Sequence, residues 1–229
     1  MPDKAQQGNV SMCQTSVQIV GDRVYKQYCL RLLPESAKPK VLQHLLTYHA
    51  QLKRAGVPMP ELYAYDETLL CEFSYCGTGV MDMVGKNPLG FVKQETNLLD
   101  QMIEICRLAI EANLSFDPHF RNFTVREGKV FYVDIFPPLI DDYFKLFSLL
   151  EHPELNRREW EHYALFHPKA VAQHFLADWL KVYHDDAVLE AISDRMKSLG
   201  VIAKIDQELI QTVIQIENRN HADPEFWLM

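Results

Sequence analysis

The chain has 229 residues, of which 48% are hydrophobic, and its formal net charge is −8. Ten Tyr and twelve Phe argue against a disordered chain, because disordered segments lack the apolar residues needed to build a core. The Lys and Arg residues form no long run, so nucleic acid is not an expected partner. No stretch approaches the roughly 18 apolar residues of a membrane span, so a membrane is not an expected partner either.

The five cysteines are an odd number and include no pair with CxxC spacing; they are Cys13, Cys29, Cys71, Cys76 and Cys106. Reduced thiols in a reducing compartment fit this pattern better than a disulfide framework or a zinc site. The first residues also lack the apolar region of a signal peptide. We therefore expect a cytoplasmic protein.

The N-terminal part of the chain has β-type patterns interrupted by one helix. Residues 15–30 alternate apolar and polar positions around a turn at Gly21, which predicts a hairpin. Residues 38–55 carry apolar side chains at helical spacing, and Gly56 ends that pattern. A β-hairpin followed by a helix is therefore expected before residue 57.

Two short β-like runs follow the helix, at residues 61–65 and 68–75. The composition then changes, because residues 76–90 contain four Gly and one Pro. Such a segment is typical of a connector between two lobes. This places the end of a small β-rich N-lobe near residue 76, so that the N-lobe spans residues 1–76.

The remainder, residues 77–229, is mostly helical by pattern and carries one further hairpin. The helices are expected at residues 91–112, 141–150, 157–165, 168–184, 186–199 and 204–217. The predicted fold class is therefore α+β, with a small β-rich N-lobe and a larger helical C-lobe. Small ligands bind preferentially in clefts between such units.

The segment from Leu114 to Asp134 carries the most specific signal in the chain. Asp117 and Asn122 are five residues apart, and a short hairpin with a turn at 126–129 leads from Asn122 to Asp134. A loop, a hairpin and a terminal Asp can bring three oxygen-bearing side chains to one point. Mg²⁺ prefers oxygen ligands of this kind. The alternative is that Asp117 caps a turn before Pro118 and Asn122 is an ordinary loop residue.

This segment resembles the catalytic loop and metal-binding strand of the aminoglycoside phosphotransferase and choline kinase branch of the protein-kinase-like fold. Those loops read roughly His-Gly-Asp-Leu-His-x-x-Asn, and a hairpin ending in Asp follows. Asp117, His119, Asn122 and Asp134 match that pattern position by position. Ser115 stands where the family has its first His, which mainly braces the loop.

The resemblance covers roughly residues 8–142 and implies a two-lobed kinase-like fold with ATP and Mg²⁺ as cofactors. It implies that Asp117 accepts the proton of a substrate hydroxyl and that Asn122 and Asp134 hold Mg²⁺. His119 would support the loop or contact the γ-phosphate.

Lys26 is the candidate for the family's phosphate-binding strand lysine. Val24, Lys26 and Tyr28 share one face of the predicted hairpin, which would point Lys26 into the cleft. The alternative is a lysine that faces solvent. The helix that follows should supply a Glu to pair with Lys26, but Ser36 to Pro60 contains no acidic residue. Gln43 or His44 could orient Lys26 instead.

Two further parts of the nucleotide site are predicted less specifically. The family binds adenine through backbone groups after a strand that corresponds to Leu70–Tyr75, so Glu72, Phe73 and Ser74 are the candidate contacts; an ordinary sheet edge would have the same sequence. The Gly-rich phosphate loop is poor, because Gly8–Ser11 contains one Gly and cannot give the repeated close approach of a GxGxxG loop.

The predicted function is transfer of the γ-phosphate of ATP to a hydroxyl of a small molecule, aminoglycoside-like or another hydroxylated metabolite. Protein substrates are not expected, because six residues separate Asp134 from Asp141 and no Ala-Pro-Glu motif follows. Asp141 and Asp142 either cap a helix or face a cationic substrate. The main alternative is an inactive pseudokinase that binds nucleotide or regulates a partner. An unrelated helical interaction protein is a third possibility.

Overall fold

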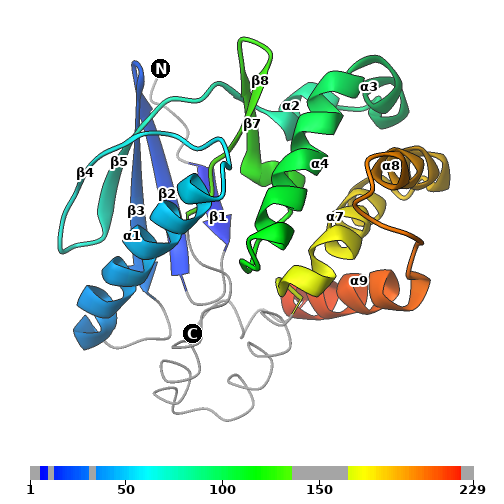
Figure 1. Ribbon diagram of the computed structural model, residues 1–229. Helices are drawn as coiled ribbons and strands as arrows, with labels where there is room; N and C mark the ends of the chain where they lie inside the picture. The colour runs from blue at the N-terminus through cyan, green and yellow to red at the C-terminus, as the bar shows by residue number, and fades with distance from the viewer. Residues whose placement is uncertain (1–5, 10–12, 31–34, 136–164, 223–229) are drawn as a thin grey trace.

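The computed structural model describes residues 6–9, 13–30, 35–135 and 165–222. These residues form an α+β fold, as the sequence predicted, and they contain two antiparallel sheets. The larger sheet has five strands in the order β1-β2-β3-β5-β4, and the smaller has three in the order β6-β7-β8. Figure 1 shows α1 alongside the five-stranded sheet, the β7–β8 hairpin and α4 in the middle, and α7, α8 and α9 beyond them.

The strands of the two sheets are, in chain order, β1 (Gln6–Asn9), β2 (Cys13–Val20), β3 (Arg23–Leu30), β4 (Leu62–Tyr65), β5 (Leu70–Ser74), β6 (Thr78–Gly79), β7 (Phe123–Arg126) and β8 (Lys129–Tyr132). The α-helices are α1 (Lys38–Arg54), α2 (Val80–Val84), α3 (Pro88–Gln94), α4 (Thr96–Glu111), α7 (Pro168–Tyr183), α8 (Asp186–Ser198) and α9 (Gln207–Ala222), and short 3₁₀ turns lie at η1 (Glu35–Ala37) and η2 (Phe120–Asn122).

The predicted N-terminal hairpin and helix are confirmed. β2 and β3 pair antiparallel around a turn in which Gly21 has φ +61°, a conformation that glycine adopts without a steric penalty. α1 buries a stripe at positions 41, 45, 48, 49 and 52, the spacing of one helix face. The helix ends before Gly56, whose φ is +85°. The imidazole of His49 on this face lies 6.3 Å from the ring of Phe73, which places α1 against β5.

Residues 76–90, predicted to connect two lobes, contain secondary structure of their own. β6 pairs with β7, and α2 follows at once, so the segment joins the smaller sheet. Gly77 makes this possible, because its φ is +94° and a Cβ built on it would lie 1.9 Å from the carbonyl oxygen of Val125. Gly77 in the predicted connector therefore permits close packing of the backbone. The division of the chain into lobes 1–76 and 77–229 remains a prediction.

The helix expected at residues 91–112 is divided into α3 and α4. Asn87 caps α3 by accepting a hydrogen bond of 3.0 Å from the N–H of Gly90, and Pro88 occupies the first turn, so α3 begins before the predicted start. Glu95 then leaves the helical conformation, with φ −100° and ψ 42°. Apolar spacing continues across this break, which is why the pattern predicted one helix.

The hairpin predicted after Asn122 is confirmed as β7 and β8, and the helices expected at residues 168–184, 186–199 and 204–217 are observed as α7, α8 and α9. The helices expected at 141–150 and 157–165 lie outside the described residues, except for Leu165. α7 is buried along almost its whole length and contacts α4, α8 and α9. It therefore forms the centre of the helical part of the protein.

Two expectations from the sequence concern membrane-spanning helices and the state of the cysteines. Within these residues, no helix combines the length and the apolar character that crossing a membrane requires. Cys71, Cys76 and Cys106 are buried free thiols, in line with the expectation of reduced cysteines. The pKa of Cys71 is raised by burial to about 11, so this thiol is neutral at physiological pH.

We predict that Gly77→Ala lowers the free energy of unfolding much more than Gly21→Ala. Both positions have positive φ, which costs an L-residue about 1 kcal/mol. A Cβ at Gly21 meets nothing within 4 Å, whereas one at Gly77 collides with the backbone of Val125, which raises the total to at least about 3 kcal/mol. Urea unfolding of both variants measures the difference, and equal losses would contradict the proposed packing of β6 on β7.

Candidate functional site

The loop from Leu114 to Asn122 is anchored to three parts of the protein. The N–H of Phe116 donates to the carbonyl of Phe166, 2.9 Å away, just before α7. The hydroxyl of Tyr48 on α1 donates to the carbonyl of Ser115 at 2.8 Å. The rings of Phe116 and Tyr132 lie 4.2 Å apart, which packs the loop on the β7–β8 hairpin. The loop is therefore held by contacts distant in sequence, including the one at Ser115.

Asp117 is buried, and its carboxylate turns back onto its own loop. Oδ1 accepts a hydrogen bond of 3.1 Å from the N–H of His119 and also contacts His119 Nδ1. The turn-capping role considered as an alternative is therefore present. Burial would raise the pKa of Asp117, but the neighbouring His119 lowers it below its usual range. The carboxylate stays ionised at neutral pH, so capping is compatible with a role in accepting a proton.

Asn122 and Asp134 come together at the open end of the hairpin. The N–H of Val133 donates to the carbonyl of Asn122 at 2.9 Å, so Asn122 lies beside the residue preceding Asp134. The Asn122 amide nitrogen donates to the carbonyl of Asp117 at 3.4 Å. The pKa of Tyr48 is raised by burial and then by Asp134 and Asp117, so both carboxylates lie within electrostatic reach of one hydroxyl. The structure thus brings these three predicted residues together.

Lys26 reaches the same place from the five-stranded sheet. It lies on β3, and its Nζ donates to the carbonyl of Val133 at 2.5 Å. Burial lowers the pKa of Lys26, and Asp134 is the largest charge that opposes this shift. The lysine is therefore not a solvent-facing strand residue. Its hydrogen bond goes to the main chain beside Asp134, while Gln43, one of the residues considered as its partner, is exposed.

The candidate adenine contacts lie on β5, which is an internal strand between β3 and β4. The interpretation of this strand as a sheet edge is therefore wrong. Glu72 pairs with Arg23 at 3.2 Å, Phe73 is buried, and the N–H of Ser74 donates to the carbonyl of Glu61 at 2.9 Å. Their contact with adenine stays a prediction.

The other predicted parts of the site are only partly described. Gly8 and Asn9 lie in β1, where Gly8 pairs with Thr15 on β2. Val10 and Ser11, the rest of the weak phosphate-loop candidate, lie outside the described residues, as do Asp141 and Asp142.

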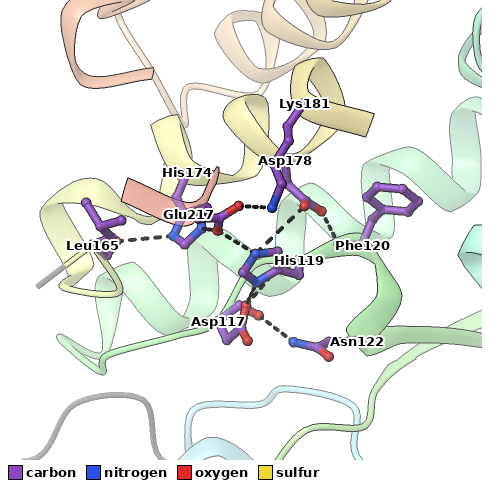
Figure 2. A network of polar contacts seen from close by, with 9 residues as sticks. All are labelled: Asp117, His119, Phe120, Asn122, Leu165, His174, Asp178, Lys181 and Glu217. Atoms are coloured by element: carbon purple, nitrogen blue, oxygen red, sulfur yellow. Dashed lines mark hydrogen bonds and ion pairs between the residues drawn. The ribbon is translucent and has the colours of Figure 1, made fainter. Parts of the chain in front are cut away.

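His119 stands in the middle of a buried polar network that Figure 2 shows. Its Nε2 lies 2.6 Å from Oε1 of Glu217, and Nε2 of His174 lies 2.8 Å from the same oxygen. Burial would lower the pKa of His119, but Asp117, Glu217 and Asp178 raise it to about 10. The protonated ring donates to a carboxylate on each side. Because both ring nitrogens are engaged, the geometry favours loop support over contact with a phosphate.

Asp178 on α7 also holds the loop. Its Oδ2 accepts a hydrogen bond of 2.8 Å from the N–H of Phe120. The ring of Phe120 stacks on Trp179 with 5.0 Å between centroids, next to Asp178 on the same helix. Burial raises the pKa of Asp178. A polar and an aromatic contact from adjacent residues of α7 therefore fix the segment between Asp117 and Asn122.

Sequence reasoning did not identify the residues that support the loop: His174, Asp178, Lys181 and Glu217. A signal for them existed. His174 and Asp178 are four residues apart on a helix that is otherwise almost entirely apolar at buried positions. Glu217 follows Val213 by four residues, on the side of α9 that is buried. Polar residues at core positions of a helix need buried partners, so these positions could have been singled out.

Asn122 and Asp134 fit a hard cation such as Mg²⁺, because they offer an amide oxygen and a carboxylate. Asn122 directs its amide nitrogen toward Asp117, which is the orientation that leaves its oxygen for another partner. Lys26 beside them suits a polyphosphate. A second group with possible metal ligands is formed by His119, His174 and Glu217, whose ligand atoms lie within 4.8 Å of one another.

Comparison with known proteins gives limited information. No protein-family model matches the chain, and no curated protein matches it. Among solved structures, the chain is similar to a choline/ethanolamine kinase family protein from Mesorhizobium loti, with 13% sequence identity, 93% of each chain covered and a TM-score of 0.31. A likeness at this level does not support a conclusion about activity, which has to come from the residues themselves.

We predict that the hydrogen bond from Phe120 to Asp178 stabilises the folded protein. Asp178→Asn keeps an oxygen that can accept the Phe120 N–H, whereas Asp178→Ala leaves this buried donor unpaired. Both variants remove the same charge beside His119, so their difference reports the loss of the hydrogen-bond acceptor together with the volume of the amide. The Ala variant should be less stable than the Asn variant by about 1–3 kcal/mol in urea unfolding. Equal stability of the two variants would show that the loop is held by other contacts.

Proposed function

We propose that this protein is an ATP- and Mg²⁺-dependent phosphotransferase that transfers the γ-phosphate to a hydroxyl of a small molecule. The observation that supports it is the convergence of Asp117, Asn122, Asp134 and Lys26 from a loop, a hairpin and a separate sheet. Phosphoryl transfer needs these groups, because catalysis consists mainly of positioning and charge stabilisation.

Each residue has a role that follows from its surroundings. Asp117 orients the acceptor hydroxyl and takes its proton. The pKa of Asp117 is held below its usual range by His119, so the carboxylate accepts the proton only as the new O–P bond forms. Asn122 and Asp134 hold Mg²⁺, which neutralises charge on the transferring phosphate when bound. Lys26 binds the α- and β-phosphates.

The acceptor is proposed to be a hydroxylated small molecule, of the aminoglycoside type or another metabolite. Only Ile135–Ile140 separate Asp134 from the next acidic pair, which leaves no room for an ordinary activation segment. The net charge of −8 suits a cationic acceptor. Nucleic acid and membranes are not proposed as partners, and the proposed location is the cytoplasm.

A non-catalytic nucleotide-binding protein is the second candidate, and one observation favours it. α1 lies where the kinase-like resemblance expects a Glu to pair with Lys26, but it contains no acidic residue. Lys26 donates instead to the Val133 carbonyl. Thermal stabilisation by ATP and Mg²⁺ separates both candidates from an unrelated interaction protein. ATP consumption against a panel of hydroxylated metabolites then separates an enzyme from a pseudokinase.

We predict that Asp134→Ala abolishes the Mg²⁺-dependent part of thermal stabilisation by ATP while the unliganded protein remains folded. The reason is that Asp134 supplies the charged metal ligand. Glu127→Gln is the matched control, because Glu127 is an exposed carboxylate in the turn of the same hairpin. The measurement is the melting temperature with ATP, with and without Mg²⁺. An unchanged Mg²⁺ dependence in Asp134→Ala would remove this residue from the site.

We predict that Asp117→Asn binds ATP and Mg²⁺ about as well as the parent, while turnover falls by roughly two to four orders of magnitude. Asn keeps the size and the hydrogen-bonding shape of Asp but cannot take a proton. Asp194→Asn controls for the loss of a charge, because Asp194 is exposed and pairs with Lys197 on α8. Turnover that survives in Asp117→Asn would mean that the reaction is catalysed elsewhere.

A further inference from the structure

Glu217 is a buried residue on α9, 98 residues beyond His119 in sequence. Its carboxylate contacts Nε2 of the His119 ring, on the side opposite Asp117. The same oxygen is approached by Nε2 of His174, whose Nδ1 lies 3.3 Å from the carbonyl of Leu165. The second oxygen of Glu217 contacts Nζ of Lys181. A single side chain on α9 thus joins α7 to the loop that carries Asp117, as Figure 2 shows.

Two imidazoles can be held at one carboxylate either by a shared metal ion or by direct hydrogen bonds. The distances between the ring nitrogens and the carboxylate oxygen distinguish the two cases. Ligand atoms of a tetrahedral zinc site are about 3.3 Å apart, since each lies about 2.0 Å from the metal. The separations of 2.6 and 2.8 Å here are hydrogen-bond lengths. A carboxylate oxygen only accepts, so each Nε2 donates to Glu217. Lys181 already balances the charge of Glu217 from the other side.

The consequence for Asp117 follows from the His119 ring. The ring contacts Asp117 through Nδ1 and Glu217 through Nε2, and it lies edge-on to His174 at 4.9 Å between centroids. Rotation of the ring would break both carboxylate contacts together. The direction of the Asp117 carboxylate is therefore coupled to the position of α9.

We propose that Glu217 is a positioning residue, which acts through His119 to hold the Asp117 loop in its working geometry. The proposal rests on the proposed function in that Asp117 is taken as the group that meets the acceptor hydroxyl. Glu217 contacts His119, His174 and Lys181 and does not contact Asp117 directly. The proposal therefore gives a residue of α9 an indirect influence on the rate of the reaction. The effect of Glu217 on the stability of the loop can be measured by amide exchange, even if the protein shows no enzymatic turnover.

The experiment compares Glu217→Ala and Glu217→Gln with Val213→Ala. Val213 is fully buried one turn earlier on α9 and lies outside the network, so its variant reports loss of helix packing alone. In Glu217→Ala, amide exchange measured by NMR should speed up about tenfold or more at His119 and Asn122, relative to the global change. Both amides donate within the loop, at 3.1 Å to Asp117 and at 2.9 Å to the His119 carbonyl. The Phe120 amide, held by Asp178, is the internal reference.

The kinetic readout separates positioning from general destabilisation. Glu217→Ala should lower kcat about ten- to a hundredfold with an unchanged KM for ATP, because misplacement of a reacting group affects the transition state. Glu217→Gln should restore most of kcat, because its amide oxygen can still accept hydrogen bonds from both imidazoles. Val213→Ala should leave kcat unchanged at temperatures where it is folded.

Several outcomes would overturn the proposal. These are unchanged exchange at His119 and Asn122 in Glu217→Ala, equal acceleration in Val213→Ala, or stoichiometric zinc in the parent protein that is lost in Glu217→Ala. If Glu217→Ala does not fold, ring ¹⁵N spectra of the parent decide, since the proposal requires a proton on Nε2 of both His119 and His174. A parent that binds ATP but never consumes it refutes the proposed function, whereas the exchange data still decide the role of Glu217.

Discussion

The geometry of the candidate site depends on the contacts that the buried imidazole of His119 makes with carboxylates on both sides of its ring. This ring touches Asp117 within its own loop and Glu217 on α9, and a carboxylate oxygen of Asp178 lies 3.8 Å from its Nε2. A carboxylate or an imidazolium buried alone would be strongly unfavourable. Here each charge is compensated by another, so the loop, α7 and α9 must be in place together.

The loop around Ser115 is supported from several other elements of the structure. Support comes from Tyr48 on α1, from Asp178 on α7 and from Glu217 through His119. Removal of one partner from a buried charge network is costly because it leaves the other charge unpaired. Apolar residues of similar volume could stabilise the fold as well as this network does. What the network adds is a defined direction of the Asp117 side chain.

Local structure in this chain was largely predictable. The β2–β3 hairpin, α1, the β7–β8 hairpin and the later helices follow from alternation, helical spacing and turn glycines, which act between residues close in sequence. The failures also have local causes. Gly77 permits a close β6–β7 contact inside the segment predicted to connect two lobes, and apolar spacing continued across the break at Glu95. Pattern alone cannot distinguish these cases.

The sequence by itself determined the α+β class and the candidates Asp117, Asn122 and Asp134, because the spacing of loop, hairpin and terminal Asp is encoded in one short segment. Lys26 was a candidate from its place on the predicted N-terminal hairpin. Only the tertiary structure decided that Lys26 meets the end of this hairpin, that β5 is internal, and that Glu217 supports His119. The physical reason is that such contacts join residues tens of positions apart. Their formation depends on which faces of the helices and strands pack together, which periodicity does not specify.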